Sequence, residues 1–261
     1  MISKQSYRKW IRDRNEELFQ YEIDYKHSGK KWRTTQLSIT NTFIEEYNAS
    51  GFYPEYLITR NYWYKQSNRD KVVEHNKRLT NVVMDFIKPT NIKPIFIDHF
   101  IEKHKDKQRS IKDDDAKIVL VKNTISGQYE DDVEYELIEG TYHTHTIVTG
   151  IDDDKIFYPN CKIQSAIENV YGMERPPISL LETDEGLKKI KKDLLNYEIR
   201  KRCNFLGNSK DSLEITSADE KAGRDGFQGW KGIVAYCLKN VYNVDTLLEI
   251  YDDKNSSLFP K

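Results

Sequence analysis

Strand-like patterns, in which apolar and polar positions alternate or β-branched and aromatic residues cluster, recur along the chain. They predict strands over residues 55–63, 94–104, 117–121, 133–139, 142–148 and 213–216. The apolar run at 94–104 fits both a strand and a short helix, and we interpret it as a strand. Residues 133–139 and 142–148 are separated by Gly140 and Thr141, which predicts a hairpin with a two-residue turn.

Helix-like spacing of apolar residues alternates with these strands. It predicts helices over residues 1–50, with breaks at 28–29 and 48–51, and over residues 68–87, 164–171, 185–205 and 230–242. Pro176 and Pro177 predict a break, and residues 223–229 a glycine-rich loop. A strand followed by a long helix opens an α+β unit, so the fold class that we expect is α+β.

Composition fits one large or two small globular domains. The chain has 261 residues, of which 38% are hydrophobic, 32% charged and 12% aromatic. That aromatic content argues against wholesale disorder. Neither a signal peptide nor a stretch long enough to cross a bilayer is visible, so we expect a cytoplasmic protein with no membrane partner. Cys161, Cys203 and Cys237 are far apart and predict neither a disulfide framework nor a cysteine zinc site.

The charge pattern leaves nucleic-acid binding open. A formal net charge of −1 argues against a protein that grips long duplex DNA, which usually carries a basic excess. Basic residues nevertheless crowd two segments, residues 8–33 and 188–202. Either run can be a solvated helix face or a surface that binds DNA. The aromatic residues Tyr62, Trp63 and Tyr64 are either core residues or platforms for base stacking.

A His-x-His pair lies on the strand 142–148. Side chains alternate along a strand, so His143 and His145 share a face and can present two nitrogen ligands to one cation. With a two-residue turn, Glu136 pairs with His145 and lies on that face, and Glu134 is one step further out. Two imidazoles and a carboxylate suit Mn²⁺ or Mg²⁺. Alternatively these glutamates form a solvated face, and a one-residue slip in the turn would move them to the other side.

A tyrosine and a lysine share one face of the last predicted helix. At 3.6 residues per turn, Lys239 and Asn240 fall on the same side as Tyr236, whereas Tyr242 does not. A phenol with a pKa of about 10 is a poor nucleophile until a nearby cation stabilises its phenolate. The pair is therefore either catalytic or an ordinary amphipathic surface pair.

Together these residues resemble a known family. Thr-Tyr-His-Thr-His-Thr-Ile-Val at 141–148 and Val-Ala-Tyr-Cys-Leu-Lys at 234–239 resemble the HUH and Y-x-x-K motifs of HUH endonucleases. Residues 56–61 loosely resemble the family's first motif. Thr144 departs from the apolar residue that the family prefers, which is tolerable because it points away from the metal. Residues 105–132 would be a long insertion before the HUH hairpin.

The resemblance to single-tyrosine rolling-circle replication initiators implies both a fold and an activity. The fold would be a ferredoxin-like antiparallel sheet with flanking helices, forming a nuclease domain over 53–245 between a helical extension at 1–52 and a tail at 246–261. The activity would be metal-dependent nicking and rejoining of single-stranded DNA at an origin through a 5′-phosphotyrosine. Tyr236 and Lys239 would be catalytic, and His143, His145 and Glu136 would bind Mn²⁺ or Mg²⁺.

The resemblance also implies partners, and other functions stay open beside it. The chain has no Gly-x-x-x-x-Gly-Lys-Ser/Thr loop, so a separate helicase and polymerase would act with it on the single-stranded DNA or origin hairpin. A transposase-like or relaxase-like nuclease is one alternative. The others are a metal-dependent hydrolase that forms no covalent intermediate, and a non-catalytic DNA-binding protein.

Overall fold

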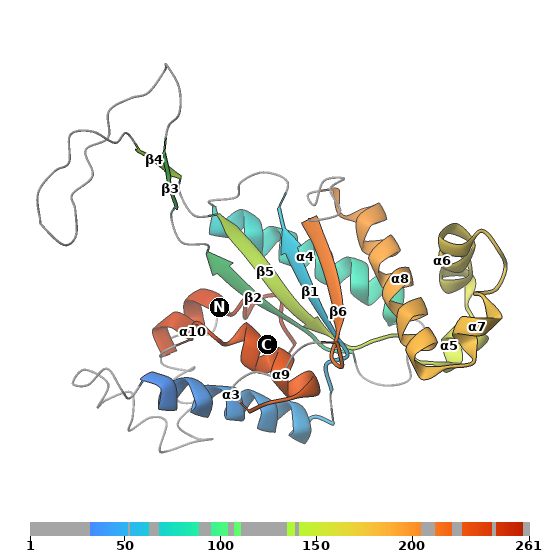
Figure 1. Ribbon diagram of the computed structural model, residues 1–261, viewed down its shortest axis with the longest axis horizontal. Coiled ribbons are helices and arrows are strands. Elements are labelled where there is room, and N and C mark those ends of the chain that lie inside the picture. Colours follow the sequence, from blue (N-terminus) through green and yellow to red (C-terminus); the bar gives the residue numbers. More distant parts are fainter. Residues whose placement is uncertain are drawn as a thin grey trace, which may run out of the picture.

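A four-stranded antiparallel sheet lies at the centre of the chain (Figure 1). The computed structural model describes residues 32–51, 53–62, 68–88, 95–103, 107–110, 135–138, 141–204, 212–220, 226–241 and 244–257. The strand order is β2-β5-β1-β6. These strands are β1 (Tyr56–Asn61), β2 (Ile97–Lys103), β5 (Tyr142–Val148) and β6 (Leu213–Ser217). Helices flank the sheet, so the predicted α+β class is confirmed.

Two long helices complete the topology. Helix α4 (Arg69–Ile87) connects β1 to β2, and α8 (Asp184–Arg202) precedes β6. The resulting β-α-β-β-α-β order, with β5 and β1 in the middle of an antiparallel sheet, is the ferredoxin-like arrangement that the family resemblance implies. The run at 94–104 does contain a strand. The predicted strand 117–121 lies outside the described residues.

A separate pair of strands follows β2 along the chain. Strands β3 (Lys107–Ser110) and β4 (Tyr135–Ile138) pair with each other in a two-stranded sheet. In sequence they lie between β2 and β5, which are themselves neighbours in the main sheet. The insertion therefore interrupts the hairpin that β2 and β5 form, rather than preceding it.

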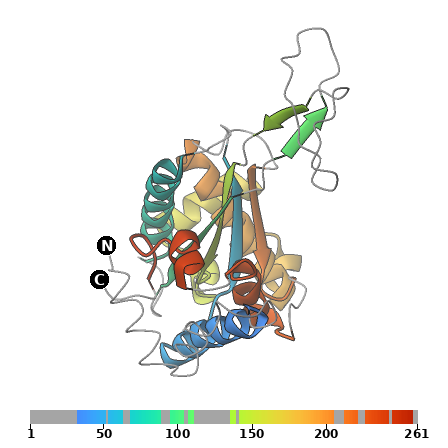
Figure 2. The same ribbon diagram turned by 90° about the vertical axis from the view of Figure 1, so that its left-hand side faces the viewer.

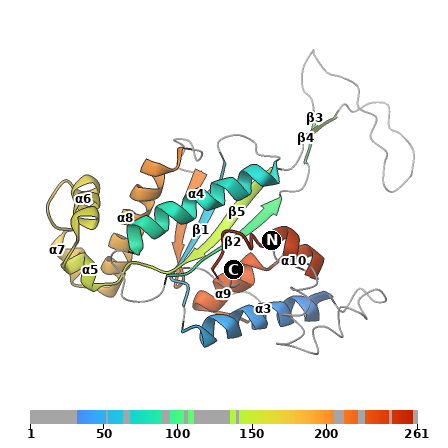
Figure 3. The same cartoon turned by 180° about the vertical axis from the view of Figure 1, so that it is seen from behind.

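Helices α4 and α8 cover one face of the sheet (Figure 3). Each begins at a side chain that caps free backbone N–H groups. Asn68 accepts hydrogen bonds from the N–H groups of Asp70 and Lys71, and Thr183 accepts one from Gly186. Acidic residues in the first turn of α8 and basic ones in its last turn complement the helix dipole. The apolar sides of both helices bury a shared core.

Three short helices project beyond α8 at one end of the molecule (Figure 1). They are α5 (Asp154–Phe157), α6 (Cys161–Tyr171) and α7 (Ile178–Leu181). Asn160 caps the start of α6, and Gly172, with φ of 67°, ends it in the left-handed conformation that glycine adopts readily. Pro176 and Pro177 separate α6 from α7, as predicted.

A second layer of helices covers the other face of the sheet. It consists of α3 (Trp32–Ala49), α9 (Gly229–Cys237) and α10 (Val244–Ile250). Helix α3 lies beside α9 (Figure 2). Phe43, Tyr47 and Leu247 are among the side chains that this layer buries against the sheet. Residues 1–31 of the predicted helical extension lie outside the described residues.

The segment after α10 also packs against the sheet. Tyr251 bridges to Phe100 of β2, and the N–H groups of Asp252 and Ser257 donate to the carbonyls of His99 and Ile97 at 3.0 and 2.9 Å. Residues 251–257 are thus tied to the exposed edge of β2. All three cysteines have free thiols. No helix among the described residues is long and apolar enough to span a membrane.

Candidate metal centre

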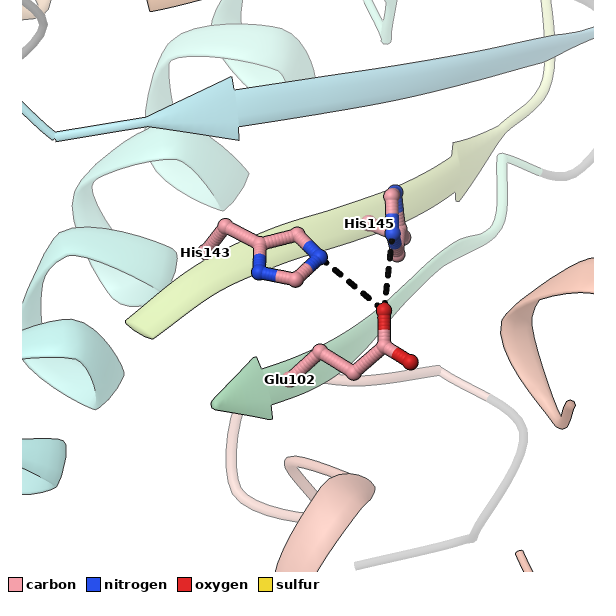
Figure 4. A group of neighbouring side chains, drawn as sticks. All are labelled: Glu102, His143 and His145. Atoms are coloured by element: carbon pink, nitrogen blue, oxygen red, sulfur yellow. Dashed lines mark hydrogen bonds and ion pairs between the residues drawn. The ribbon is translucent and has the colours of Figure 1, made fainter. Parts of the chain in front are cut away.

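His143 and His145 lie on β5, one of the two central strands. Both side chains are buried and point toward Glu102 (Figure 4). His145 contacts Tyr236 of α9, so they lie on the face that α9 covers. The prediction that they share a face is confirmed. Thr144, between them, points to the opposite face, where its hydroxyl is 2.5 Å from the phenolic oxygen of the largely buried Tyr62. The departure from the family's apolar residue therefore lies away from the two imidazoles, as expected.

A buried carboxylate from β2 completes the cluster. Glu102 is directly opposite His143 in the antiparallel register. Its Oε2 lies 2.9 Å from Nε2 of His143 and 3.2 Å from Nε2 of His145 (Figure 4). One potential ligand atom from each of the three residues lies within 4.8 Å of the others. Two imidazole nitrogens and one carboxylate oxygen are a donor set that fits a divalent cation, with further positions left for water or substrate.

The predicted pairing of Glu136 with His145 is wrong. The two neighbours of β5 are β1 and β2, so no edge of β5 remains for the strand that carries Glu136. That strand, β4, pairs with β3 and places Glu136 opposite Arg109. Without this pairing, strand register no longer supports Glu136 as the third ligand, and Glu102 lies beside the histidines instead. Glu134, the second candidate, lies outside the described residues.

Sequence reasoning missed Glu102 because adjacent strands in a chain are not always paired. The signal was present: Glu102 is an acidic residue at the end of an apolar strand, two positions from the buried Phe100 and therefore on the same face. Treating the whole of residues 104–141, rather than 105–132 alone, as an insertion at the tip of a β2-β5 hairpin brings Glu102 opposite His143. Choosing the shortest turn excluded that possibility.

Thr59 orients His145 from the other side. It lies on β1 directly opposite His145, and its Oγ1 is 3.1 Å from Nδ1 of that imidazole. A hydrogen bond to one ring nitrogen fixes the orientation of the ring and leaves the other nitrogen for a cation. Here the fixed ring presents Nε2 to Glu102.

Burial and hydrogen bonding set the charge states in the cluster. Burial raises the pKa of Glu102, but hydrogen bonds from His143, His145 and Lys239 outweigh it and hold that pKa well below its usual range. Burial lowers the pKa of His145 to about 4, against the opposing effect of Glu102. An ionised carboxylate and a neutral imidazole are the forms that bind metal ions.

Tyr236 lies against this cluster. Its ring centroid is 5.1 Å from that of His145, at an interplanar angle of 73°. Lys239 joins the two features: its Nζ lies 4.1 Å from the centroid of the Tyr236 ring and 2.8 Å from Oε2 of Glu102. Asn240 donates a hydrogen bond to the other carboxylate oxygen, Oε1. The sequence-predicted residues Tyr236, Lys239, His143 and His145 therefore meet at one place.

The helix that carries Tyr236 is shorter than predicted. It ends at Cys237 rather than 242, and residues 238–240 form a turn. The prediction placed Lys239 beside Tyr236 because both would lie on one helical face, whereas the turn brings Lys239 there. Tyr242 lies outside the described residues.

The second basic segment lies far from the cluster in the fold. Helix α8 packs on the opposite face of the sheet, and several of its cations form ion pairs. These are Lys188 with Asp219, Lys191 with Asp153, Lys192 with Glu220 and Arg202 with Asp85. A role of this helix in DNA binding stays a prediction. Trp63, Tyr64 and the basic segment 8–31 lie outside the described residues.

In comparisons with known proteins, no family model, no curated protein and no solved structure matches this chain.

Proposed function

We propose that the chain is a metal-dependent single-strand DNA endonuclease and strand transferase of the HUH type, which nicks an origin to initiate rolling-circle replication. The observation that carries the proposal is the contact of Tyr236 with a Glu-His-His cluster, with the ammonium group of Lys239 between them. An aromatic nucleophile, a cation and a candidate metal centre on one face of a ferredoxin-like sheet are the parts that this reaction needs.

Each residue has a defined role in the proposed reaction. Glu102, His143 and His145 would hold Mn²⁺ or Mg²⁺, which when bound withdraws charge from the non-bridging oxygens of a phosphodiester. The Tyr236 oxygen forms a bond to phosphorus while the bond to the 3′ oxygen breaks, giving a 5′-phosphotyrosine and a free 3′-hydroxyl. The phenol loses its proton to water and the departing oxygen gains one. Lys239 stabilises the developing phenolate electrostatically.

The covalent bond also accounts for joining. It conserves the energy of the original phosphodiester, so that attack by a second 3′-hydroxyl reverses the step. A metal-dependent hydrolase that uses the same cluster to activate water would lack this ability, because it forms no covalent intermediate. The two functions therefore differ in whether a DNA fragment stays covalently attached to the protein.

A labelling experiment tests the proposal. The chain is incubated with Mn²⁺ and a pool of single-stranded DNA of random sequence, and the products are denatured in detergent. We expect a 3′-terminal label to migrate with the protein and a 5′-terminal label to be released. Tyr236→Phe should abolish the adduct, and Tyr53→Phe, which changes an exposed tyrosine outside the cluster, should retain it.

Three results would count against the proposal. One is cleavage without an adduct in the parent chain, which would favour the hydrolase. Another is an adduct that survives Tyr236→Phe. The third is an adduct that persists in His143→Ala or in the presence of a chelator, because the cluster would then not be needed for the chemistry.

A further inference from the structure

Exposed apolar side chains gather on one small part of the described surface. Among the described residues five large hydrophobic side chains are exposed, and four of them belong to the segment of residues 151–183 that carries α5, α6 and α7. They are Phe157, Tyr158, Met173 and Ile178, and Tyr158 is 80% exposed. This α5-α7 segment projects at one end of the molecule, and α10 lies at the other (Figure 1). Clustered exposed apolar groups are typical of interaction sites.

A cleft lies within the same segment. It has a volume of about 780 Å³, and Phe157, Tyr158 and Leu181 form part of its apolar lining. Gln164 holds the polar wall together, because its side-chain amide donates to Oε1 of Glu168 and to the carbonyl of Glu174, both at 2.9 Å. The cleft thus has an apolar wall and a polar wall, and the polar wall carries two carboxylates, Glu168 and Glu174, and one cation, Arg175.

The charge of the segment distinguishes between kinds of ligand. Residues 151–183 contain six acidic and three basic side chains, an excess of three negative charges, whereas α8 contains four acidic and seven basic ones. Nucleic-acid binding depends first on cations that neutralise phosphates. The cleft is lined by two carboxylates and one guanidinium and lies in a segment with an excess of negative charge, so it does not suit a nucleic acid. It suits a polypeptide that carries lysine or arginine beside an apolar side chain.

The segment is anchored firmly to the body of the protein. A Cβ atom at Gly186 of α8 would lie 2.1 Å from the carbonyl oxygen of Leu180, so α7 packs directly onto the α8 backbone. The buried Lys191 of α8 forms an ion pair with Asp153 at 2.5 Å, just before α5. The exposed groups are consequently presented on a fixed support, and changing them should leave the fold intact.

We propose that the α5-α7 cleft is a docking site for a short basic and apolar segment of a partner protein. The apolar side chain of the partner would enter between Phe157 and Leu181, and its lysine or arginine would pair with Glu168 or Glu174. A contact confined to one cleft buries less surface than a stable protein–protein interface, so we expect it to be weak and reversible. Such a site is separate from the proposed nuclease activity and would recruit another protein to it.

Peptide binding to the full chain tests this site. The probe is a set of fluorescent peptides of about 12 residues in which lysine or arginine flanks leucine, phenylalanine or tryptophan. We expect saturable binding of at least one peptide, measured by fluorescence anisotropy. Replacing its basic residues by glutamate should weaken binding about tenfold or more, which corresponds to about 1.4 kcal/mol.

Substitutions in the cleft test whether the peptide binds there. Tyr158→Ser and Glu174→Lys should each weaken the peptide about tenfold. Tyr53→Ser, at an exposed aromatic residue outside this segment, should not. The site is overturned if no peptide binds, or if Tyr158→Ser binds as well as the parent. It is equally overturned if this variant instead loses binding of an oligothymidylate, or if it dissociates a parent dimer in sedimentation velocity, because the occupant would then be nucleic acid or a second copy.

Discussion

At the scale of single residues, Glu102 is the centre of the candidate site. Its two oxygens accept hydrogen bonds from His143, His145 and Asn240, and one of them forms an ion pair with Lys239. The ammonium group of Lys239 and a divalent cation would therefore share one carboxylate oxygen. Because both are positive, each disfavours the other at that position.

Lys239→Met is expected to tighten Mn²⁺ binding while lowering DNA cleavage. The substitution removes a positive charge that lies 2.8 Å from the ligand oxygen, so the affinity should rise on the order of tenfold. Calorimetric titration with Mn²⁺ measures this effect without depending on activity. Lys239→Arg, which keeps the charge, is the control and should bind Mn²⁺ like the parent. Unchanged or weaker binding in Lys239→Met would show that the ammonium group does not oppose the cation.

Glu102→Gln should remove most of the metal affinity, and Glu136→Gln should have no effect. Glu102 supplies the only carboxylate in the cluster that the described residues form, and a neutral amide is a much poorer ligand for Mn²⁺. We expect a loss of about 100-fold or more in the same titration. The opposite pattern, in which Glu136→Gln binds Mn²⁺ more weakly than Glu102→Gln does, would identify Glu136 as the third ligand.

Most of the site could be predicted from local patterns, and its third ligand could not. His143 and His145 share a face because of strand periodicity alone. Tyr236 and Lys239 are close in sequence, so both a helix and a turn bring them together. Glu102 is 41 residues from His143 in the chain, and its position depends on which strands pair. Strand pairing is a property of the whole sheet and is not encoded in any one segment.

At the scale of elements, the face of the sheet opposite the cluster contains a buried polar network. Arg60 of β1 donates to Asn76 of α4 at 2.6 Å and to Thr146 of β5 at 3.1 Å. His99 of β2 lies between Thr80 and Thr146, with its ring nitrogens 2.7 Å from each hydroxyl. Asn76 also donates to Asp252. The network therefore links all three strands β1, β2 and β5 to the helix above them and to the C-terminal segment.

Because of this network, the free energy of unfolding should decrease as the pH is lowered. Burial, and secondarily Arg60, holds the pKa of His99 well below its ordinary value. The unfolded chain then binds a proton below about pH 6.5 that the folded chain excludes, so stability decreases as the pH falls through that value. Between pH 7 and 5 this one group should destabilise the fold by about 2 kcal/mol.

Urea unfolding at both pH values measures the effect. His99→Gln, which cannot be protonated, should show a smaller pH dependence than the parent by about that amount. The low pKa of His145 acts in the same direction and is present in both proteins, so it cancels in the difference. Equal pH dependence in the two proteins would mean that His99 accepts a proton in the folded state.

Element boundaries could be predicted where the chain carries local stop signals. Helix α4 begins after the capping residue Asn68 and ends shortly before Pro89, within a residue of the prediction. Helix α9 was predicted five residues too long because Leu238 and Val241 continue the apolar pattern. Both are fully buried, but Leu238 lies in the turn that follows the helix and Val241 lies just after that turn. Burial creates the same hydrophobic pattern whether or not the backbone stays helical.

At the scale of the whole molecule, the sheet separates two apolar cores, and the core around the candidate site depends on both ends of the described chain. Tyr47 of α3 and Tyr251 both donate to the buried Asp98 of β2, at 2.5 and 2.7 Å. Phe43 packs against Phe100 and Tyr251, with ring centroids 6.0 and 5.6 Å away. The segments on either side of the predicted nuclease domain thus contribute to the same core.

Truncation after Asn243 is therefore expected to unfold the protein rather than to trim it. It removes the fully buried Leu247 and the buried Tyr251, whose burial contributes roughly 2–3 kcal/mol each. It also removes two donors to Asp98, the Tyr251 hydroxyl and the Ser257 N–H group. The loss approaches the total stability of a typical domain, about 5–15 kcal/mol. Thermal unfolding followed by circular dichroism should lose its cooperative transition.

Glu249→Ala, at an exposed position of the same helix, is the control and should unfold like the parent. A truncated chain with a near-normal transition would instead mean that residues 1–243 fold independently of α10, and that the candidate site needs no cover from it.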